Sequence, residues 1–139
     1  MKEFVYEHMV LLNETNAMAG VVYFSNFVKW QGMAREFILS QHPKFKEMMS
    51  RPIEMITQNC SVNFLGHLYF GDKIQIKVTT RRILPASFVL VFRYFNKETN
   101  QLIATGEQKV AFANLQTREL CETPEEIRQL AQSVEEKEK

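Results

Sequence analysis

Residues 23–41 read YFSNFVKWQGMAREFILSQ, and this stretch decides how the rest of the chain folds. At about 100° per residue its apolar positions fall on one stripe of an α-helix, so the spacing predicts a helix from about Tyr23 to Gln41. Pro43 follows, and a helix is expected to stop before it. The members of the stripe are Tyr23, Phe27, Trp30, Ala34, Phe37 and Ile38.

Segments around this helix predict strands. Residues 4–12 (FVYEHMVLL) read as a strand that leads into a polar loop, where we expect Glu14 to face water. Residues 74–79 alternate apolar and polar side chains, which is typical of a strand with one buried face. Residues 88–95 are apolar on both faces apart from Arg93, which indicates a central strand.

The remaining segments complete the layout. Residues 44–54 predict a short helical turn, residues 55–65 are β-like, and residues 102–115 form a returning strand after a polar turn. Thr123 is the expected N-cap of a short helix over residues 123–134. The order predicts one α+β domain over residues 1–139, in which an antiparallel sheet wraps the long helix. Open strand edges favour dimerisation edge to edge.

Composition narrows the possible partners. The chain has 139 residues, 45% hydrophobic and 24% charged, with a net charge of +1, so nucleic acid is not an expected partner. No apolar run is long enough for a membrane span, and the N-terminus lacks the apolar core of a signal peptide. We therefore expect a cytoplasmic protein that has no membrane partner.

Three compositional features leave alternatives open. Residues 73–97 carry a net +6 and residues 119–139 a net −4, so the basic segment either docks an acidic or phosphate-bearing partner or forms solvated strand faces. Cys60 and Cys121 are expected as free thiols, although a disulfide is the alternative. Eleven Phe indicate either an aromatic core or an apolar tunnel, and one face of the strand at 88–95 is a candidate lining.

Common catalytic motifs are absent from the sequence. There is no GxSxG elbow, no HExxH or CxxC spacing and no glycine-rich nucleotide loop, so we expect no metal and no cofactor. His8, His42 and His67 are interpreted as structural or surface residues. On the predicted helix, Gln31 and Arg35 are i, i+4 neighbours at the border of the buried stripe. Arg35 is either a snorkelling side chain with a structural carboxylate partner or an anchor for a substrate carbonyl or anion.

The segment GVVYFSNFVKWQGMAREFIL (residues 20–39) resembles the hot-dog-fold thioesterases of the 4-hydroxybenzoyl-CoA thioesterase type. More narrowly, ETN (14–16), WQGMARE (30–36) and ATGEQKVAF (104–112) resemble the enediyne-polyketide thioesterases, which act on acyl carrier protein. FGDKIQIKV (70–78) is a weaker match, and the resemblance runs over about residues 5–130. It implies a hot-dog fold with a long helix wrapped by a curved antiparallel sheet, and active sites at a dimer interface.

The resemblance also implies site residues. Many hot-dog thioesterases carry an acid in the loop before the helix, and this position aligns here with Ala17. The enediyne type uses an Asn instead. Asn16 corresponds to that Asn if the loop of this chain contains one inserted residue. Arg35 matches the family's functional Arg, and Phe27 replaces a family Tyr. We therefore expect Asn16 to position an attacking water, and backbone N–H groups at the helix start, around Gly20–Phe24, to polarise the thioester carbonyl.

The remaining expectations concern the substrate. We assign substrate binding to Tyr23, Phe24, Phe27, Gln31, Arg81 and Arg82, with the last two contacting an acidic carrier protein. The expected function is hydrolysis of a long-chain or polyene β-ketoacyl thioester from acyl carrier protein by a homodimer or homotetramer. The alternatives are an acyl-CoA thioesterase and a non-catalytic acyl-binding module.

Overall fold

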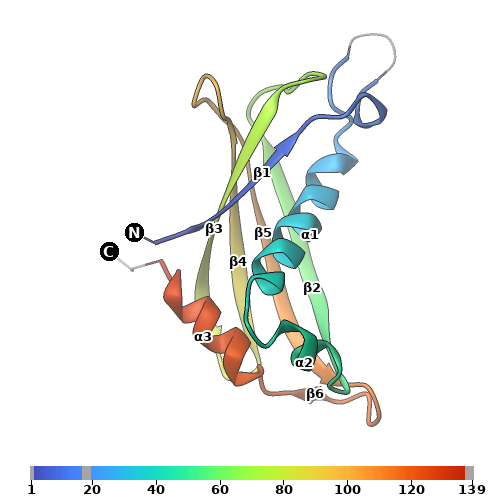
Figure 1. Ribbon diagram of the computed structural model, residues 1–139, viewed down its shortest axis with the longest axis vertical. Coiled ribbons are helices and arrows are strands. Elements are labelled where there is room, and N and C mark those ends of the chain that lie inside the picture. The colour runs from blue at the N-terminus through green and yellow to red at the C-terminus, as the bar shows by residue number, and fades with distance from the viewer. Residues whose placement is uncertain (1, 17–19, 137–139) are drawn as a thin grey trace.

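The computed structural model describes residues 2–16 and 20–136. The predicted long helix is confirmed as α1, and the strands and both short helices lie in the predicted order (Figure 1). The elements are β1 (Phe4–Met9), the 3₁₀ turn η1 (Leu12–Glu14), α1 (Ser25–Ser40), α2 (Phe45–Met49), β2 (Ile53–Phe64), β3 (Lys73–Leu84), β4 (Ser87–Asn96), β5 (Leu102–Asn114), β6 (Leu120–Cys121) and α3 (Glu125–Ser133).

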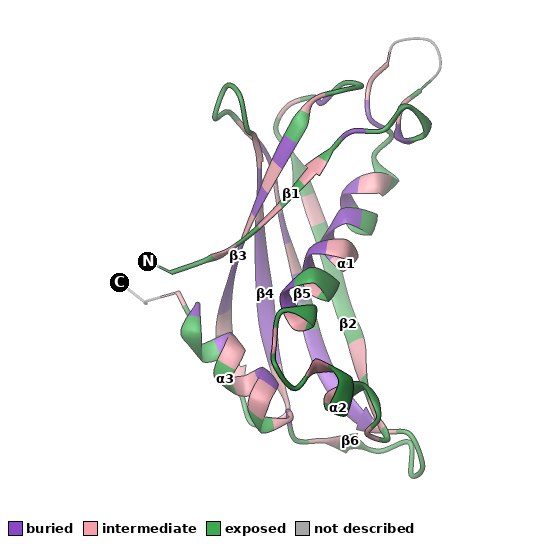
Figure 2. Cartoon of the chain, in the orientation of Figure 1, coloured by how far each residue is buried: buried purple, intermediate pink, exposed green. Residues whose placement is uncertain are grey.

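The strands form one antiparallel sheet in the order β1-β3-β4-β5-β2, with β6 added to the end of β5. β4 is central and buried along most of its length, as its sequence predicted, whereas β2 is an edge strand with many exposed side chains (Figure 2). α1 and α3 lie on the same face of the sheet, because side chains from both helices and from β3 and β4 line one cavity. None of the described helices is long and apolar enough to cross a bilayer.

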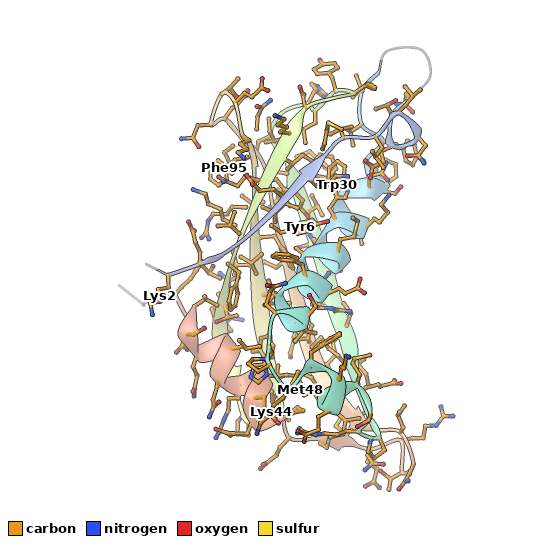
Figure 3. All side chains as sticks on the ribbon, viewed as in Figure 1. Lys2, Tyr6, Trp30, Lys44, Met48 and Phe95 are labelled. Carbon is orange, nitrogen blue, oxygen red and sulfur yellow. The ribbon has the colours of Figure 1, made fainter. Side chains whose placement is uncertain are left out.

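The apolar stripe of α1 is buried only in part. Trp30 and Ala34 are fully buried, and Trp30 lies in the space between α1 and β1, where Tyr6 also points (Figure 3). Tyr23 and Phe37 are 48% and 41% exposed, contrary to prediction. Tyr23 precedes the first turn of the helix, and Phe37 packs only on the ring of Tyr6 at the rim, 5.4 Å between centroids.

Gln31 is a polar residue inserted between α1 and the sheet. Its side chain is fully buried and donates from Nε2 to the carbonyl of Ser61 on β2 at 3.1 Å. Room for it comes from Gly106 on β5, where an added Cβ would lie 2.4 Å from Gln31 Nε2 and 2.7 Å from Ser61 O. The glycine is therefore required by close approach of the helix side chain to the sheet.

Glu14 is buried, which corrects the expectation that it faces water: it is 1% exposed. Oε1 accepts hydrogen bonds from the Leu11 N–H at 2.7 Å and the His8 ring at 2.9 Å. Oε2 accepts from the Trp30 indole N–H at 2.8 Å and pairs with Lys29 at 2.8 Å. The carboxylate thus joins the end of β1 to the first half of α1.

The hydrogen bonds to Glu14 determine its charge state. Burial alone raises the pKa of the carboxyl, but the bonds from Lys29, the Leu11 N–H, His8 and Trp30 outweigh burial and lower the pKa from 4.5 to about 2. The residue is therefore ionised in the folded protein throughout the neutral and mildly acidic range.

The C-terminal helix begins differently from the prediction. Pro124, rather than Thr123, occupies the N-cap position, and no side chain caps the helix. The hydroxyl of Thr123 is buried without a hydrogen-bond partner among the described residues. After α3 the chain runs along the free edge of β3, where the N–H of Thr80 donates to Val134 O at 3.1 Å and the N–H of Glu136 to Thr80 O at 2.8 Å. This segment covers the part of β3 that β1 does not reach.

We expect Gly106→Ala to lower the free energy of unfolding by about 1–3 kcal/mol, because the methyl group overlaps Gln31 and the Ser61 carbonyl. Urea denaturation measures the change. Gly32→Ala is the matched control: its Cβ meets nothing within 4 Å, and helix propensity predicts stabilisation of about 0.5–1 kcal/mol. Equal effects of the two substitutions would contradict the close packing of Gln31.

We expect wild-type stability to fall between pH 4.5 and about 2, because the Glu14 carboxyl has a lower pKa folded than unfolded and is protonated on unfolding in this range. The full shift corresponds to roughly 3 kcal/mol. Glu14→Gln removes this contribution, so the variant is less stable at pH 7 and its stability depends less on pH in this interval. Denaturation at several pH values tests this, with Glu36→Gln as the control, because Glu36 is an exposed acid on α1. An unchanged acid slope in Glu14→Gln would contradict the assignment.

Candidate functional site

A cavity of about 290 Å³ lies where the loop before α1 meets the segment between β2 and β3. We call it the helix-start cavity. It collects four of the predicted site residues, Asn16, Tyr23, Phe24 and Phe27, at one place. Its full lining is Asn16, Val21, Val22, Tyr23, Phe24, Phe27, Phe64, Gly66, His67 and Leu68.

Backbone hydrogen bonds hold Asn16 at the cavity. The Asn16 N–H donates to Val21 O at 2.8 Å, and the Gly20 N–H donates to Asn16 O at 3.0 Å, which closes the loop on itself. Gly20 adopts a φ of +69°, a conformation that glycine reaches without steric cost. The Asn16 side chain is exposed and has no hydrogen-bond partner among the described residues, so it is available to a ligand. Ala17, the position aligned with the family's acid, lies outside the described residues.

The start of α1 supplies backbone donors at Phe24, within the expected range Gly20–Phe24, and at Ser25, but not at Gly20 itself. The Gly20 N–H is engaged within the loop, the Val22 N–H donates to Leu68 O at 2.9 Å, and the Tyr23 N–H donates to Glu14 O at 2.9 Å. Within the described residues no acceptor is found for the N–H groups of Phe24 and Ser25. These two groups lie at the positive end of a 16-residue helix, where a developing negative charge is stabilised.

Aromatic rings form the walls of the helix-start cavity. Tyr23 and Phe24 are 48% and 60% exposed, with ring centroids 4.7 Å apart. Phe27 is 3% exposed and meets Phe64 edge-on at 5.0 Å. Its carbonyl accepts a 2.7 Å hydrogen bond from the hydroxyl of Tyr94, and burial raises the pKa of Tyr94, so this hydroxyl stays a donor at neutral pH. Tyr23 and Phe24 are thus accessible contact surfaces, whereas Phe27 belongs mainly to the core.

Arg35 lies further along α1, about 15 Å from Ser25 at the rise of an α-helix. Its Nη1 donates to Thr57 Oγ1 at 2.9 Å and to Gln108 Oε1 at 3.0 Å, so its partners are neutral groups and not the carboxylate considered above. Gln108 in turn donates to Gln31 Oε1 at 3.0 Å. Partial burial lowers the pKa of Arg35, and the thiol of Cys60 opposes the shift. A guanidinium without a carboxylate partner retains the capacity to bind an anion or carbonyl.

Arg35 also borders a narrow apolar cavity between α1, the sheet and α3, which we call the α1–α3 cavity. Its free volume is about 30 Å³, and Arg35 is the one charged residue in its lining. Phe88 and Leu90 contribute the face of β4 that the sequence marked as a candidate lining. The lining residues are Phe4, Arg35, Ile38, Leu39, Met55, Thr80, Phe88, Leu90, Ile127, Leu130 and Ala131. Asn16 and Arg35 therefore border different cavities of one subunit.

Two predicted substrate-binding residues have partners within the chain, and a third is exposed. Gln31 is fully buried, and its amide is committed to Ser61, Cys60 and Gln108. Arg81 is paired with Glu107, while Arg82 is exposed in a left-handed conformation with a φ of 51°.

The basic segment 73–97 is largely neutralised within the chain. Besides Arg81, its members Lys77, Arg93 and Lys97 pair with Glu3, Glu136 and Glu7. Ion pairs within the chain, which the sequence did not predict, therefore account for four of the six basic residues of this segment.

The described residues contain no cluster of His, Cys, Asp and Glu arranged to hold a metal ion. Cys60 and Cys121 are free, as expected. Two residues acquire importance only in three dimensions: Glu14, which fixes the loop before Asn16, and His67, which lines the helix-start cavity. Spacing does not reveal His67, because it is 51 positions from Asn16 and outside any motif.

Comparison with known proteins identifies the family of this chain. The family model of the Thioesterase-like superfamily matches residues 10–130. A 1,4-dihydroxy-2-naphthoyl-CoA hydrolase of Microcystis aeruginosa is 29% identical over 121 residues, covering 86% of this chain and 79% of that protein. One of Prochlorococcus marinus is 30% identical over 127 residues, covering 85% and 83%.

Among solved structures, the dynemicin thioesterase superposes with a TM-score of 0.91 at 25% identity, covering 99% of this chain and 100% of that one. Its crystal structures reveal induced-fit effects upon polyene binding. The match over the whole chain confirms the predicted hot-dog fold. The chain therefore belongs to the Thioesterase-like superfamily and is a thioester hydrolase.

Proposed function

We propose that this thioesterase releases a long, unsaturated acyl chain from acyl carrier protein. The observation that carries the proposal is the α1–α3 cavity, whose lining is apolar except for Arg35 and Thr80. Such a lining favours a hydrocarbon chain, because buried polar groups of a hydroxylated substrate would lose their hydrogen bonds to water. Arg35 is placed to bind a carbonyl oxygen carried far along that chain, well beyond the thioester.

The α1–α3 cavity must widen to admit an acyl chain, because about 30 Å³ holds little more than one water molecule. The proposed moving element is α3, whose displacement would break the 2.5 Å hydrogen bond from Thr80 Oγ1 to Ala131 O. Outward movement of α3 opens the cavity along α1. The polyene-dependent induced fit of the dynemicin thioesterase supports this view.

Hydrolysis itself is proposed for the helix-start cavity. Water attacks the thioester carbon. As negative charge develops on the carbonyl oxygen, this oxygen accepts hydrogen bonds from the N–H groups of Phe24 and Ser25. Asn16 orients the water through its side-chain amide. No side chain becomes a covalent nucleophile, since the lining contains no Ser, Thr or Cys.

A second copy of the chain is the proposed partner that completes the site. β2 is a 12-residue edge strand whose outer backbone groups are unpaired among the described residues, and such an edge readily pairs with another strand. Next to it lie exposed apolar residues: Phe24 (60%) and Phe64 (49%), which line the helix-start cavity, and Leu65 (60%). Pairing along β2 buries these side chains and brings the α1 helices of two subunits together.

The proposed carrier is acyl carrier protein. Arg81 is paired with Glu107, and Lys73 and Arg82 are the members of the basic segment that lack an ion pair among the described residues. We retain acyl carrier protein because of the structural likeness over the whole chain to the dynemicin thioesterase. The second candidate is an aryl-CoA, favoured by the 1,4-dihydroxy-2-naphthoyl-CoA hydrolases at 29–30% identity and by the aromatic walls of the helix-start cavity.

Hydrolysis rates on three substrates separate these functions: one polyene acyl chain on carrier protein, the same chain on CoA, and 1,4-dihydroxy-2-naphthoyl-CoA. We expect the highest kcat/KM for the carrier-bound chain. A higher kcat/KM for the same chain on CoA would agree with the proposed acyl chain but contradict acyl carrier protein as its carrier. Preference for the aryl-CoA would overturn the proposed substrate class, and binding without turnover would indicate an acyl-binding module.

We expect Arg35→Ala to lower kcat/KM for an acyl thioester that carries a keto group far along its chain by roughly 10- to 100-fold, the range for loss of one charge-assisted hydrogen bond. A saturated acyl thioester without the keto group should be affected less, because it lacks the oxygen that Arg35 binds. Arg128→Ala is the control, since this arginine pairs with Glu125 on α3. Denaturation measurements report whether loss of the Gln108 and Thr57 contacts unfolds the variant. Full turnover by a folded Arg35→Ala variant would contradict the proposed role of Arg35 in substrate binding.

A further inference from the structure

We propose that His67 is the general base that activates the attacking water. The inference rests on the proposed site of hydrolysis and supplies the proton acceptor that this site otherwise lacks. His67 lines the helix-start cavity together with Asn16. Apart from the phenol of Tyr23 it is the one ionisable side chain in that lining, and imidazole is the group suited to exchanging protons near neutral pH.

The backbone on both sides of His67 is fixed. Before it, the N–H groups of Leu65 and Gly66 both donate to Ile103 O on β5, at 2.8 and 3.0 Å. After it, Leu68 is 1% exposed and its carbonyl accepts from the Val22 N–H at 2.9 Å.

Residues 69–70 are joined to the loop before α1. The Phe70 N–H donates to Gly20 O at 3.1 Å, and Val21 forms an antiparallel bridge with Tyr69. Since the Asn16 N–H donates to Val21 O, residues 15–16, 21–22 and 68–70 lie side by side. His67 is thus held beside Asn16, although its own side chain is exposed.

The three histidines differ in what their rings contact. The His8 ring is hydrogen-bonded to Glu14 at 2.9 Å, and His42 Nδ1 accepts the Lys44 N–H at 3.0 Å. Among the described residues no group is hydrogen-bonded to the His67 ring. Both of its nitrogens are therefore available to water and substrate.

Other ionisable groups near this segment are already committed. Asp72 Oδ2 accepts the Tyr69 N–H at 2.9 Å. Glu14, on the far side of the loop, is buried and bonded through both oxygens. Tyr23, before α1, is the remaining group that faces the cavity. None of the carboxylates near the loop lines the cavity, so none competes with His67 as proton acceptor there.

The chemical step balances without any further reactant. A nitrogen of the neutral His67 ring accepts a proton from water as the water oxygen bonds to the thioester carbon, and the carbonyl electron pair moves to oxygen. When the carbonyl re-forms, the carbon–sulfur bond breaks and the imidazolium returns the proton to the departing thiolate. The products are a carboxylic acid and the free thiol of the carrier.

The test is the pH dependence of kcat for His67→Gln and His67→Ala with the best thioester found for the wild type. We expect kcat to fall by roughly 100-fold with little change in KM, and the rise in rate from pH 5 to 8 to disappear. Added imidazole should restore turnover in His67→Ala. His42→Gln is the matched control and should retain wild-type rates, because His42 lies between α1 and α2, away from the helix-start cavity.

Each outcome decides one question. Wild-type kcat and an unchanged pH profile in a folded His67→Gln variant would overturn the role of His67 and leave the proposed substrate intact. A wild-type enzyme that prefers an aryl-CoA would overturn the substrate proposal, while the variant comparison on that aryl-CoA would still decide the base. No wild-type turnover on any thioester would overturn both.

Discussion

The buried carboxylate of Glu14 is the interaction on which the candidate site depends. A charged group at 1% exposure persists only when its hydrogen bonds replace those to water, and here both oxygens are engaged by groups from β1, η1 and α1. Its own backbone carbonyl accepts from the Tyr23 N–H and the Asn26 side chain, both at 2.9 Å. One residue therefore fixes the register between the strand, the loop that carries Asn16 and the start of the helix.

A second polar system determines how α1 sits on the sheet. Gln31 fits against Gly106 and connects through Gln108 to Arg35, so the amide and guanidinium groups form one chain of hydrogen bonds between helix and sheet. The helix-start cavity lies at the start of α1, and the α1–α3 cavity lies along the second half of the helix. The separation suits an elongated substrate whose thioester lies at one end of α1 and whose hydrocarbon chain follows the helix toward Arg35.

Much of the fold was predictable because it follows from periodicity. The stripe at Phe27, Trp30, Ala34 and Ile38 identified α1, and the doubly apolar run at residues 88–95 identified the central strand. The site was predictable in part: Asn16, Tyr23 and Phe24 do line one cavity. The sequence does not show that Gln31 and Arg81, predicted as substrate contacts, have the intrachain partners Gln108 and Glu107.

The sequence by itself determined the long amphipathic helix, the antiparallel strands that cover it and the family to which they belong, since these depend on local spacing and on motifs contiguous in the chain. Only the tertiary structure decided which polar groups are buried and which remain available. Glu14 and Gln31 turned inward because partners distant in sequence satisfy them. His67 stayed available because its backbone, but not its ring, is held by neighbouring segments. Which groups become hydrogen-bond partners depends on contacts in the folded chain, and spacing along the sequence does not show these contacts.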